Sequence, residues 1–279
     1  MQVARFMTRK PVTVEPDAPL DAAYRLMHEK GFRHLPVATG NEVAGIVSDR
    51  DLALATGGLP AELRGDTGDS PPPSAVREVM RSPVVCVEQH EPGARAAKHM
   101  VEQRIGALPV LDEGLLIGIV TETNLVKVFS DLCRDPAVSD ELDGSVEHLM
   151  KSPVVTLSPE DEFTVAIDRF RDWRIRHVPV VSGDELIGMV SDRDVRMAMG
   201  RALIADAQDQ QDGTLDVYNE PIENIMARTV VTIEPEASLS EAVHVMLENR
   251  ISALPVGVDG ALFGIVTRTD ILEHYASVA

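Results

Sequence analysis

Three short motifs combine a hydroxyl with a carboxylate three residues later. They are Ser48/Asp51, Ser191/Asp194 and Thr267/Asp270, and the fourth copy is Thr121/Asn124. An ionised carboxylate can accept two O–H donors at once. A hydroxyl at the start of a helix lies beside free backbone N–H groups, which together with the helix dipole favour phosphate. The same pattern also describes an ordinary helix N-cap, which stabilises a protein by about 1 kcal/mol. The motif therefore indicates either a ligand site or a structural cap.

A second pair of motifs places an arginine before a histidine. These are Arg33-His34 and Arg176-His177, each just ahead of an apolar-Pro-Val segment. A guanidinium offers a fixed fork of donors that suits phosphate, and histidine adds a donor, and a charge when it is protonated. On so acidic a chain, surface ion pairs with Asp or Glu are an equal alternative. At the corresponding places, Gly106-Ala107 and Ser252-Ala253 are small enough to let a ligand or a neighbouring repeat approach closely.

All these motifs recur with a fixed spacing from four methionines. Counting from Met7, Met80, Met150 and Met226, a proline follows 29 residues on and a glycine 38 residues on. Such a period indicates repeated structural units. The first and third repeats share Arg-His and Ser-Asp-Arg-Asp, whereas the second and fourth share Arg-Ile-Gly/Ser-Ala-Leu-Pro-Val. The chain is therefore interpreted as a duplicated pair of repeats.

Each repeat is expected to form strand, helix, strand, strand and helix. In the fourth repeat, residues 230–233 form a β-branched run, and Ser238 stands three residues before Glu241, as in a helix capping box. Apolar residues then follow at helical spacing, which predicts one buried face. The aligned apolar positions are Leu239, Ala242, Val243 and Met246; Phe163, Ala166, Ile167 and Phe170; and Leu20, Ala23, Tyr24 and Met27. The second repeat fits this apolar pattern less well, with Gly93 at the first of these positions.

The pattern resembles the cystathionine-β-synthase (CBS) domain, a small β-α-β-β-α module found in tandem, Bateman-type pairs. The resemblance implies an α+β fold of four modules in two pseudo-symmetric pairs that form a disc, either within one chain or in a homodimer. We expect repeats at residues 1–56, 76–130, 146–205 and 222–279, with linkers at 57–75, 131–145 and 206–221. Repeat 1 should pack on repeat 2, and repeat 3 on repeat 4. Gly-Ile-Val strands lying in one continuous sheet would contradict this arrangement.

The resemblance also implies a ligand, because many CBS pairs bind adenosine nucleotides. The motif aspartates Asp51, Asp194 and Asp270 would then hold the ribose hydroxyls, and Ser48, Ser191 and Thr267 the phosphates. The side chains of Arg33, His34, Arg176 and His177 are similar in position to the phosphate-binding residues of the family. Apolar residues that would line the base are Ile46, Met189 and Ile265, with Val12, Val155 and Val231, although core packing is their alternative role. Asn124 lacks the charge, so the second site should be weak or empty.

Composition narrows the function classes. A net charge of −19 argues against a nucleic-acid partner. Neither a signal-like N-terminus nor an apolar run long enough for a membrane helix is evident, and the two cysteines, Cys86 and Cys133, form no disulfide framework. We therefore expect a cytoplasmic regulatory protein, without catalytic residues, metal site or obligatory cofactor, that takes AMP, ADP or ATP as a regulatory ligand and modulates an unidentified partner protein. The alternatives are a ligand-free interaction scaffold or a sensor of S-adenosylmethionine.

Overall fold

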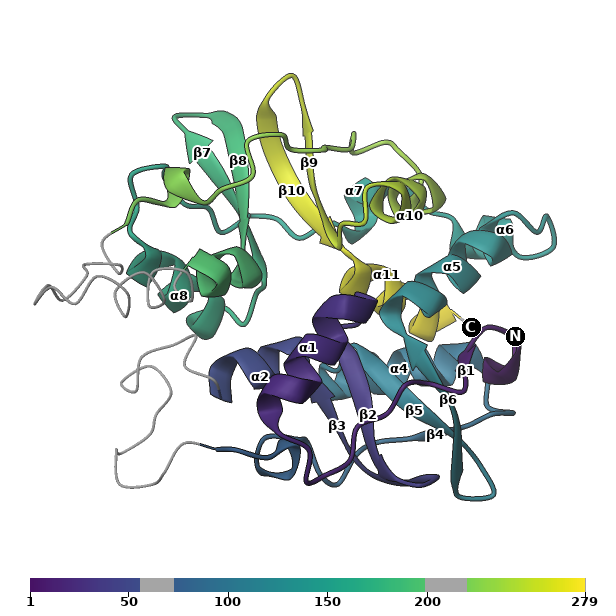
Figure 1. Cartoon of the computed structure of the whole chain (residues 1–279). Helices are drawn as coiled ribbons and strands as arrows, with labels where there is room; N and C mark the ends of the chain where they lie inside the picture. Colours follow the sequence, from purple (N-terminus) through teal and green to yellow (C-terminus); the bar gives the residue numbers. More distant parts are fainter. Residues whose placement is uncertain (56–72, 199–219, 279) are drawn as a thin grey trace, which may run out of the picture.

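The computed structural model describes residues 1–55, 73–198 and 220–278 (Figure 1). Each of the four repeats contains an antiparallel hairpin. The hairpin strands are β2 (His34–Thr39) and β3 (Glu42–Ser48), β5 (Ala107–Asp112) and β6 (Leu115–Thr121), β7 (His177–Ser182) and β8 (Glu185–Ser191), and β9 (Ala253–Val258) and β10 (Ala261–Thr267). In every hairpin the register shifts next to the repeated glycine, as between Val37 and Ala38 opposite Gly45. The hairpin is thus the constant frame of each repeat.

Two helices flank each hairpin. Those before it are α1 (Leu20–Lys30), α4 (Gly93–Gln103), α8 (Phe163–Asp172) and α10 (Leu239–Glu248). Those after it are α2 (Asp49–Ala55), α5 (Glu122–Cys133), residues 192–198 and α11 (Arg268–Val278). Shorter helices are η1 (Val3–Arg5), η2 (Val76–Glu78), α6 (Ser139–Leu142), α7 (Val146–Leu149) and η4 (Ile222–Asn224). The expected linkers at 57–75 and 206–221 lie almost wholly outside the described residues.

The predicted buried helix faces are confirmed with two differences. The four apolar positions of α10 are buried, and the Ser238 hydroxyl accepts the N–H of Glu241 at 3.1 Å, as its N-cap assignment requires. Tyr24, however, is 47% exposed and stacks on His28 one turn later, and Ile167 is only partly buried. Gly93 has a packing role in the second repeat, because a Cβ there would lie 3.1 Å from the hydroxyl of Tyr275. The absence of a side chain at this glycine therefore lets α11 pack closely on α4.

The predicted first strand of each repeat is mostly absent. Only β4 (Val87–Glu88) is a strand, parallel to β5, while the other repeats have single parallel bridges from Val14, Leu157 and Ile233. In all four repeats the chain just after the methionine crosses to the partner repeat and bonds to its hairpin. β1 (Thr8–Arg9), for example, pairs with β6 of the second repeat. Only the end of the segment then reaches its own hairpin.

This crossing explains why methionine and glycine recur together. Each methionine packs on the glycine of the partner repeat, in the pairs Met7–Gly118, Met80–Gly45, Met150–Gly264 and Met226–Gly188. A Cβ on Gly45 would lie only 2.8 Å from the sulfur of Met80, so no other residue fits without movement. The predicted pairing of repeat 1 with repeat 2, and of repeat 3 with repeat 4, is confirmed by these exchanges.

The expectation that the Gly-Ile-Val strands occupy separate sheets is wrong for the second pair. There β8 and β10 are neighbours in a sheet of order β7-β8-β10-β9, joined by one bridge between Glu185 and Ala261. The first sheet has the order β1-β6-β5-β4, and β2 and β3 form a separate one. The bridge between β8 and β10 lies at the starts of the two strands. Their Gly-Ile-Val segments are instead bonded to the chain that crosses from the partner repeat, as in Met189 with Ala227. The pairing of repeats survives, but the sheets of the second pair touch edge to edge.

The two pairs meet within one chain, repeats 1 and 2 below and repeats 3 and 4 above in Figure 1. Repeats 2 and 4 share one hydrophobic core, in which α11 packs on α4 and α5, and Phe129 meets Tyr275 edge to face. Repeats 1 and 3 each keep a separate core. The contact between them that the structure describes includes an ion pair from Arg50 to Asp192 at 3.4 Å. Repeats 2 and 4 therefore share a core, whereas the described contact between repeats 1 and 3 includes this ion pair.

Candidate functional site

The hydroxyl–carboxylate motifs form helix caps in all four repeats. The Ser48 hydroxyl donates to Asp51 Oδ2 at 2.6 Å, and the Ser48 backbone N–H donates to the same oxygen at 2.9 Å. Ser191 and Asp194 repeat this at 2.5 and 2.9 Å, and Thr121 with Asn124 at 2.7 and 3.0 Å. The structural interpretation of the motif is thus realised even where the acid is replaced.

The helix cap uses only one of the two carboxylate oxygens of Asp51 and of Asp194. Asp51 and Asp194 use only Oδ2, and within the described residues their Oδ1 atoms have no hydrogen bond or ion pair. Both side chains are partly exposed. A carboxylate oxygen held at a helix start and still open can accept hydroxyl donors from a ligand. Cap and ligand site are therefore compatible in repeats 1 and 3.

The arginines of the Arg-His motifs are exposed cations that are not neutralised by a described carboxylate. Arg33 and Arg176 are exposed, and neither forms an ion pair with a described residue, so the surface ion pair considered for them is not found there. Each acts electrostatically on the histidine of the other repeat, Arg176 on His34 and Arg33 on His177. The two motifs therefore lie in one region where repeats 1 and 3 face each other.

The histidines beside them are uncharged at neutral pH. Burial lowers the pKa of both His34 and His177 to about 4, and the attraction of nearby aspartates only partly offsets it. The positive charge that protonation of these histidines would add is therefore absent at pH 7. They can offer a hydrogen bond to a ligand, while the arginines supply the charge.

The small residues at the equivalent positions of repeats 2 and 4 pack against these histidines. A Cβ on Gly106 would lie 3.0 Å from His34 Cε1, and the Ser252 hydroxyl lies 3.1 Å from His177 Nε2. The expectation that the small residues admit the partner repeat closely is confirmed. Each histidine thus links the two repeats of its pair.

Sequence reasoning missed two charged residues at this centre, Arg268 and Glu122. Arg268 is buried and donates to the Thr123 hydroxyl at 2.9 Å and to the Met246 carbonyl at 3.3 Å, while its Nε has no partner among the described residues. Burial raises the pKa of Glu122, and Arg176, Arg268 and Arg33 oppose that rise. A signal was present, because the second motif position is acidic in three repeats and arginine only in the fourth.

The contact between repeats 1 and 3, which we call the seam, includes the carboxylate of Asp192 between the guanidinium groups of Arg50 and Arg196. Asp192 accepts from Arg196 at 2.6 Å and pairs with Arg50 across the seam. Burial lowers the pKa of Arg50, and Asp192 opposes this shift. Among the described residues, the Asp192 carboxylate is thus shared by two guanidinium groups, one of them from repeat 1.

The apolar candidates for lining a base are unequal. Ile46 is buried with Ala107 and Ile119, Met189 and Ile265 are partly buried, and Val12 is 37% exposed. Ile46, Met189 and Ile265 all lie where a crossing segment bridges the strand. In the fourth motif, Thr267 caps Asp270 in the same way at 2.6 Å, but Asp270 is buried and Lys151 pairs with its other oxygen at 3.5 Å.

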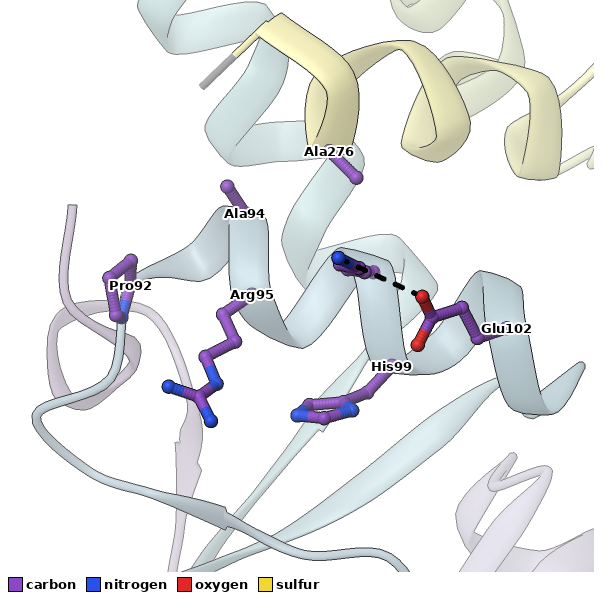
Figure 2. Close-up of a pocket in the computed structure, with 7 residues that line it drawn as sticks. Pro92, Ala94, Arg95, His99, Glu102 and Ala276 are labelled. Carbon is purple, nitrogen blue, oxygen red and sulfur yellow. Dashed lines mark ion pairs between the residues drawn. The ribbon is translucent and has the colours of Figure 1, made fainter.

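A surface hollow of about 560 Å³ lies elsewhere, beside α4 (Figure 2). It is lined by Pro92, Ala94, Arg95, Lys98, His99, Glu102 and Ala276. Its cations are matched by carboxylates, as in Lys98 with Glu102 at 3.9 Å, and none of the predicted ligand residues borders it. This hollow is therefore not assigned to the ligand.

Other chemistry finds little support in the described residues. No three His, Cys, Asp or Glu side chains there could hold a metal ion together. Burial raises the pKa of Cys86 to about 11 and that of Cys133 to about 12, so neither is a thiolate at neutral pH. None of the described helices is long and apolar enough to cross a membrane.

Comparison with known proteins identifies the repeats. The CBS domain model matches residues 3–57, 76–131, 146–201 and 222–277. This chain therefore belongs to the CBS domain family and carries four copies of the domain. An uncharacterized 33.4 kDa protein of Thermofilum pendens is 32% identical over 260 residues, which cover 90% of this chain and 83% of that protein.

The four-domain arrangement also has a solved counterpart. A Methanocaldococcus jannaschii protein described as a candidate archaeal homolog of γ-AMPK superposes with a TM-score of 0.79 at 24% identity, covering 99% of this chain and all of that one. A Pyrococcus horikoshii protein superposes with a TM-score of 0.67 at 20% identity over 99% of this chain. These likenesses show the fold shared by the three chains.

Proposed function

We propose that this protein is a regulatory CBS protein that binds adenosine nucleotides (AMP, ADP or ATP) and modulates a partner protein in the cytoplasm. The observation that carries the proposal is the coincidence of two open groups in repeats 1 and 3. Each has an aspartate with one unused carboxylate oxygen and an arginine without an ion pair among the described residues. Family membership supplies the ligand class.

In this proposal Asp51 and Asp194 accept the ribose hydroxyls, a charge-assisted contact worth about 1.5–3 kcal/mol. At the helix starts behind Ser48 and Ser191, most of the backbone N–H groups already donate within the protein, so the helix dipole is what attracts the nearest phosphate. Arg33 and Arg176 bind the phosphate oxygens, which are those of a single phosphate in AMP. Thr267 and Asp270 form a further candidate site, whose carboxylate is less open.

The charges around the centre favour a ligand with few phosphates. Glu122 brings a carboxylate to the same arginines that would hold phosphate, and His34 and His177 add no charge at neutral pH. Each additional phosphate charge meets this carboxylate. Among the three nucleotides, AMP is therefore our preferred ligand.

The seam between repeats 1 and 3 is the proposed moving part. A ligand changes a protein's arrangement only by binding one arrangement more tightly than another. Phosphates that engage Arg33 and Arg176 together draw repeats 1 and 3 toward each other, whereas the shared core holds repeats 2 and 4. A partner that touches both rims of this seam would sense the ligand.

The proposal is tested by following the melting temperature of the full chain with AMP, ATP and S-adenosylmethionine. A ligand at about 100 times its dissociation constant stabilises the folded state by about 2.7 kcal/mol. We expect stabilisation by AMP that is lost in Asp51→Ala with Asp194→Ala and kept in Asn124→Ala. Stabilisation by S-adenosylmethionine alone would assign the alternative ligand, because that molecule has no phosphate for the arginines. No shift with any of the three would favour the interaction scaffold.

A further inference from the structure

The chain just after each crossing methionine differs among the repeats. The residue at this position is Thr8, Arg81, Lys151 or Ala227. Each bridges the Gly-Ile-Val strand of the partner repeat, so its side chain starts close to that partner's motif. Lys151 exchanges both backbone hydrogen bonds with Ile265, at 2.8 and 3.1 Å, and Ala227 does the same with Met189, at 2.9 and 3.0 Å. The backbone frame is therefore the same at the third and fourth sites.

The third and fourth sites differ in the side chain at the bridging position, which is Ala227 at the third site and Lys151 at the fourth. Lys151 Nζ lies 3.5 Å from Asp270 Oδ1, and the capping box already occupies Oδ2 at 2.6 Å from the Thr267 hydroxyl. Glu273 holds the same ammonium at 3.7 Å. Asp270 is 7% exposed, whereas Asp194 is partly exposed and faces an alanine at the matching position. Both oxygens of Asp270 are thus engaged, Oδ2 by the helix cap and Oδ1 by the ammonium of Lys151, whose side chain is itself 63% exposed.

We propose that Lys151 closes the fourth motif to ribose, so that the second pair of repeats takes its nucleotide at Asp194. The inference rests on the proposed nucleotide function and names the residue that selects between two otherwise matching sites. A ribose diol needs the carboxylate oxygen that the lysine holds, and it must displace an ammonium tied to a second carboxylate. The fourth motif serves instead to fix the start of repeat 3 on repeat 4.

Register alone does not produce this closure. Arg81 has the same bridge to Ile46 in the first pair, yet it is exposed and forms no ion pair with a described residue. Asp51 therefore keeps its second oxygen although a cation stands at the equivalent position. The closure depends on the contacts of Lys151 itself.

Calorimetric titration of the full chain with AMP tests the proposal. Lys151→Ala should strengthen AMP binding at the fourth motif roughly fivefold, the effect of about 1 kcal/mol, so that more AMP is bound per chain at concentrations that fill the open sites; Lys151→Arg, which keeps the cation, should bind as the parent does. Thermal unfolding confirms that each variant is folded. An unchanged number of bound AMP molecules in Lys151→Ala, or weaker binding in that variant, would overturn the inference while leaving the nucleotide function in place. A parent that binds no AMP would overturn both.

The reverse substitution gives a second, independent measurement. In an Asp51→Ala background, where the third site reports alone, Ala227→Lys should weaken AMP binding roughly fivefold, the effect of about 1 kcal/mol from an exposed ion pair. Ala227→Met adds similar bulk without charge and should bind AMP as the background does. Equal weakening in both would mean that volume rather than the ammonium closes the site, and the proposal would fail.

Discussion

The two uncharged histidines at the centre make the stability of the fold depend on pH. A histidine whose folded pKa is about 4, below the ordinary 6.5, binds its proton more readily in the unfolded chain. Its contribution is therefore complete above about pH 6.5 and is lost as the pH falls toward 4. Between pH 7.5 and 5.0, the linkage relation gives a loss of about 2 kcal/mol for each histidine, or roughly 4 kcal/mol for both.

Charged neighbours set the size of this loss. Asp49 and Asp51 attract a proton to His34, and Asp192 and Asp194 do so for His177, while Arg33 and Arg176 repel it from both. Burial outweighs these charges at both histidines, so the pKa of each is lowered. Glu122 acts oppositely, because burial raises its pKa, so its contribution is largest at low pH and declines as the pH rises.

Urea unfolding at pH 7.5 and 5.0 separates these effects. The parent should lose about 4 kcal/mol more than the His34→Gln, His177→Gln double variant over this range, and each single variant about 2 kcal/mol more than the double. The contribution of Glu122 is common to all four proteins and cancels in the comparison. Parallel pH profiles for parent and double variant would refute the account, because the histidines would then be free to protonate in the folded state.

Three further changes test the centre and the crossings. Arg33→Ala combined with Arg176→Ala should weaken AMP and ATP binding but spare adenosine, measured by calorimetry at low salt; unchanged AMP binding would place the phosphates at the helix starts. Gly188→Ala should lower the unfolding free energy by about 1–3 kcal/mol, because its Cβ would lie 2.5 Å from the sulfur of Met226, and Gly188→Ala with Met226→Ala should recover part of the loss if that clash is the cause. Arg268→Met should cost roughly 1–3 kcal/mol in urea unfolding, since it leaves the Met246 carbonyl and the Thr123 hydroxyl without their donor, and a neutral result would show that the arginine is not needed to join repeats 2 and 4.

Local patterns in the sequence were sufficient to predict the four repeated modules. The spacing of methionine, proline and glycine predicts four units and their pairing, and the apolar helical positions predict the faces that α8 and α10 bury. The hydroxyl–carboxylate motif predicts a cap because all of its contacts lie within three residues. Such features depend on neighbours along the chain, so they can be predicted without the fold.

Contacts between repeats were decided only in the tertiary structure. Which glycine packs against which methionine follows from the crossing of the chain from each repeat to its partner. The loss of charge on His34 comes from burial against Gly106 of another repeat, and the ion pair of Lys151 with Asp270 joins residues far apart in sequence. Burial and ion pairing depend on distances through space, which four nearly identical motifs do not distinguish by themselves. The repeats therefore establish where ligand sites can exist, and their packing establishes which of those sites are open.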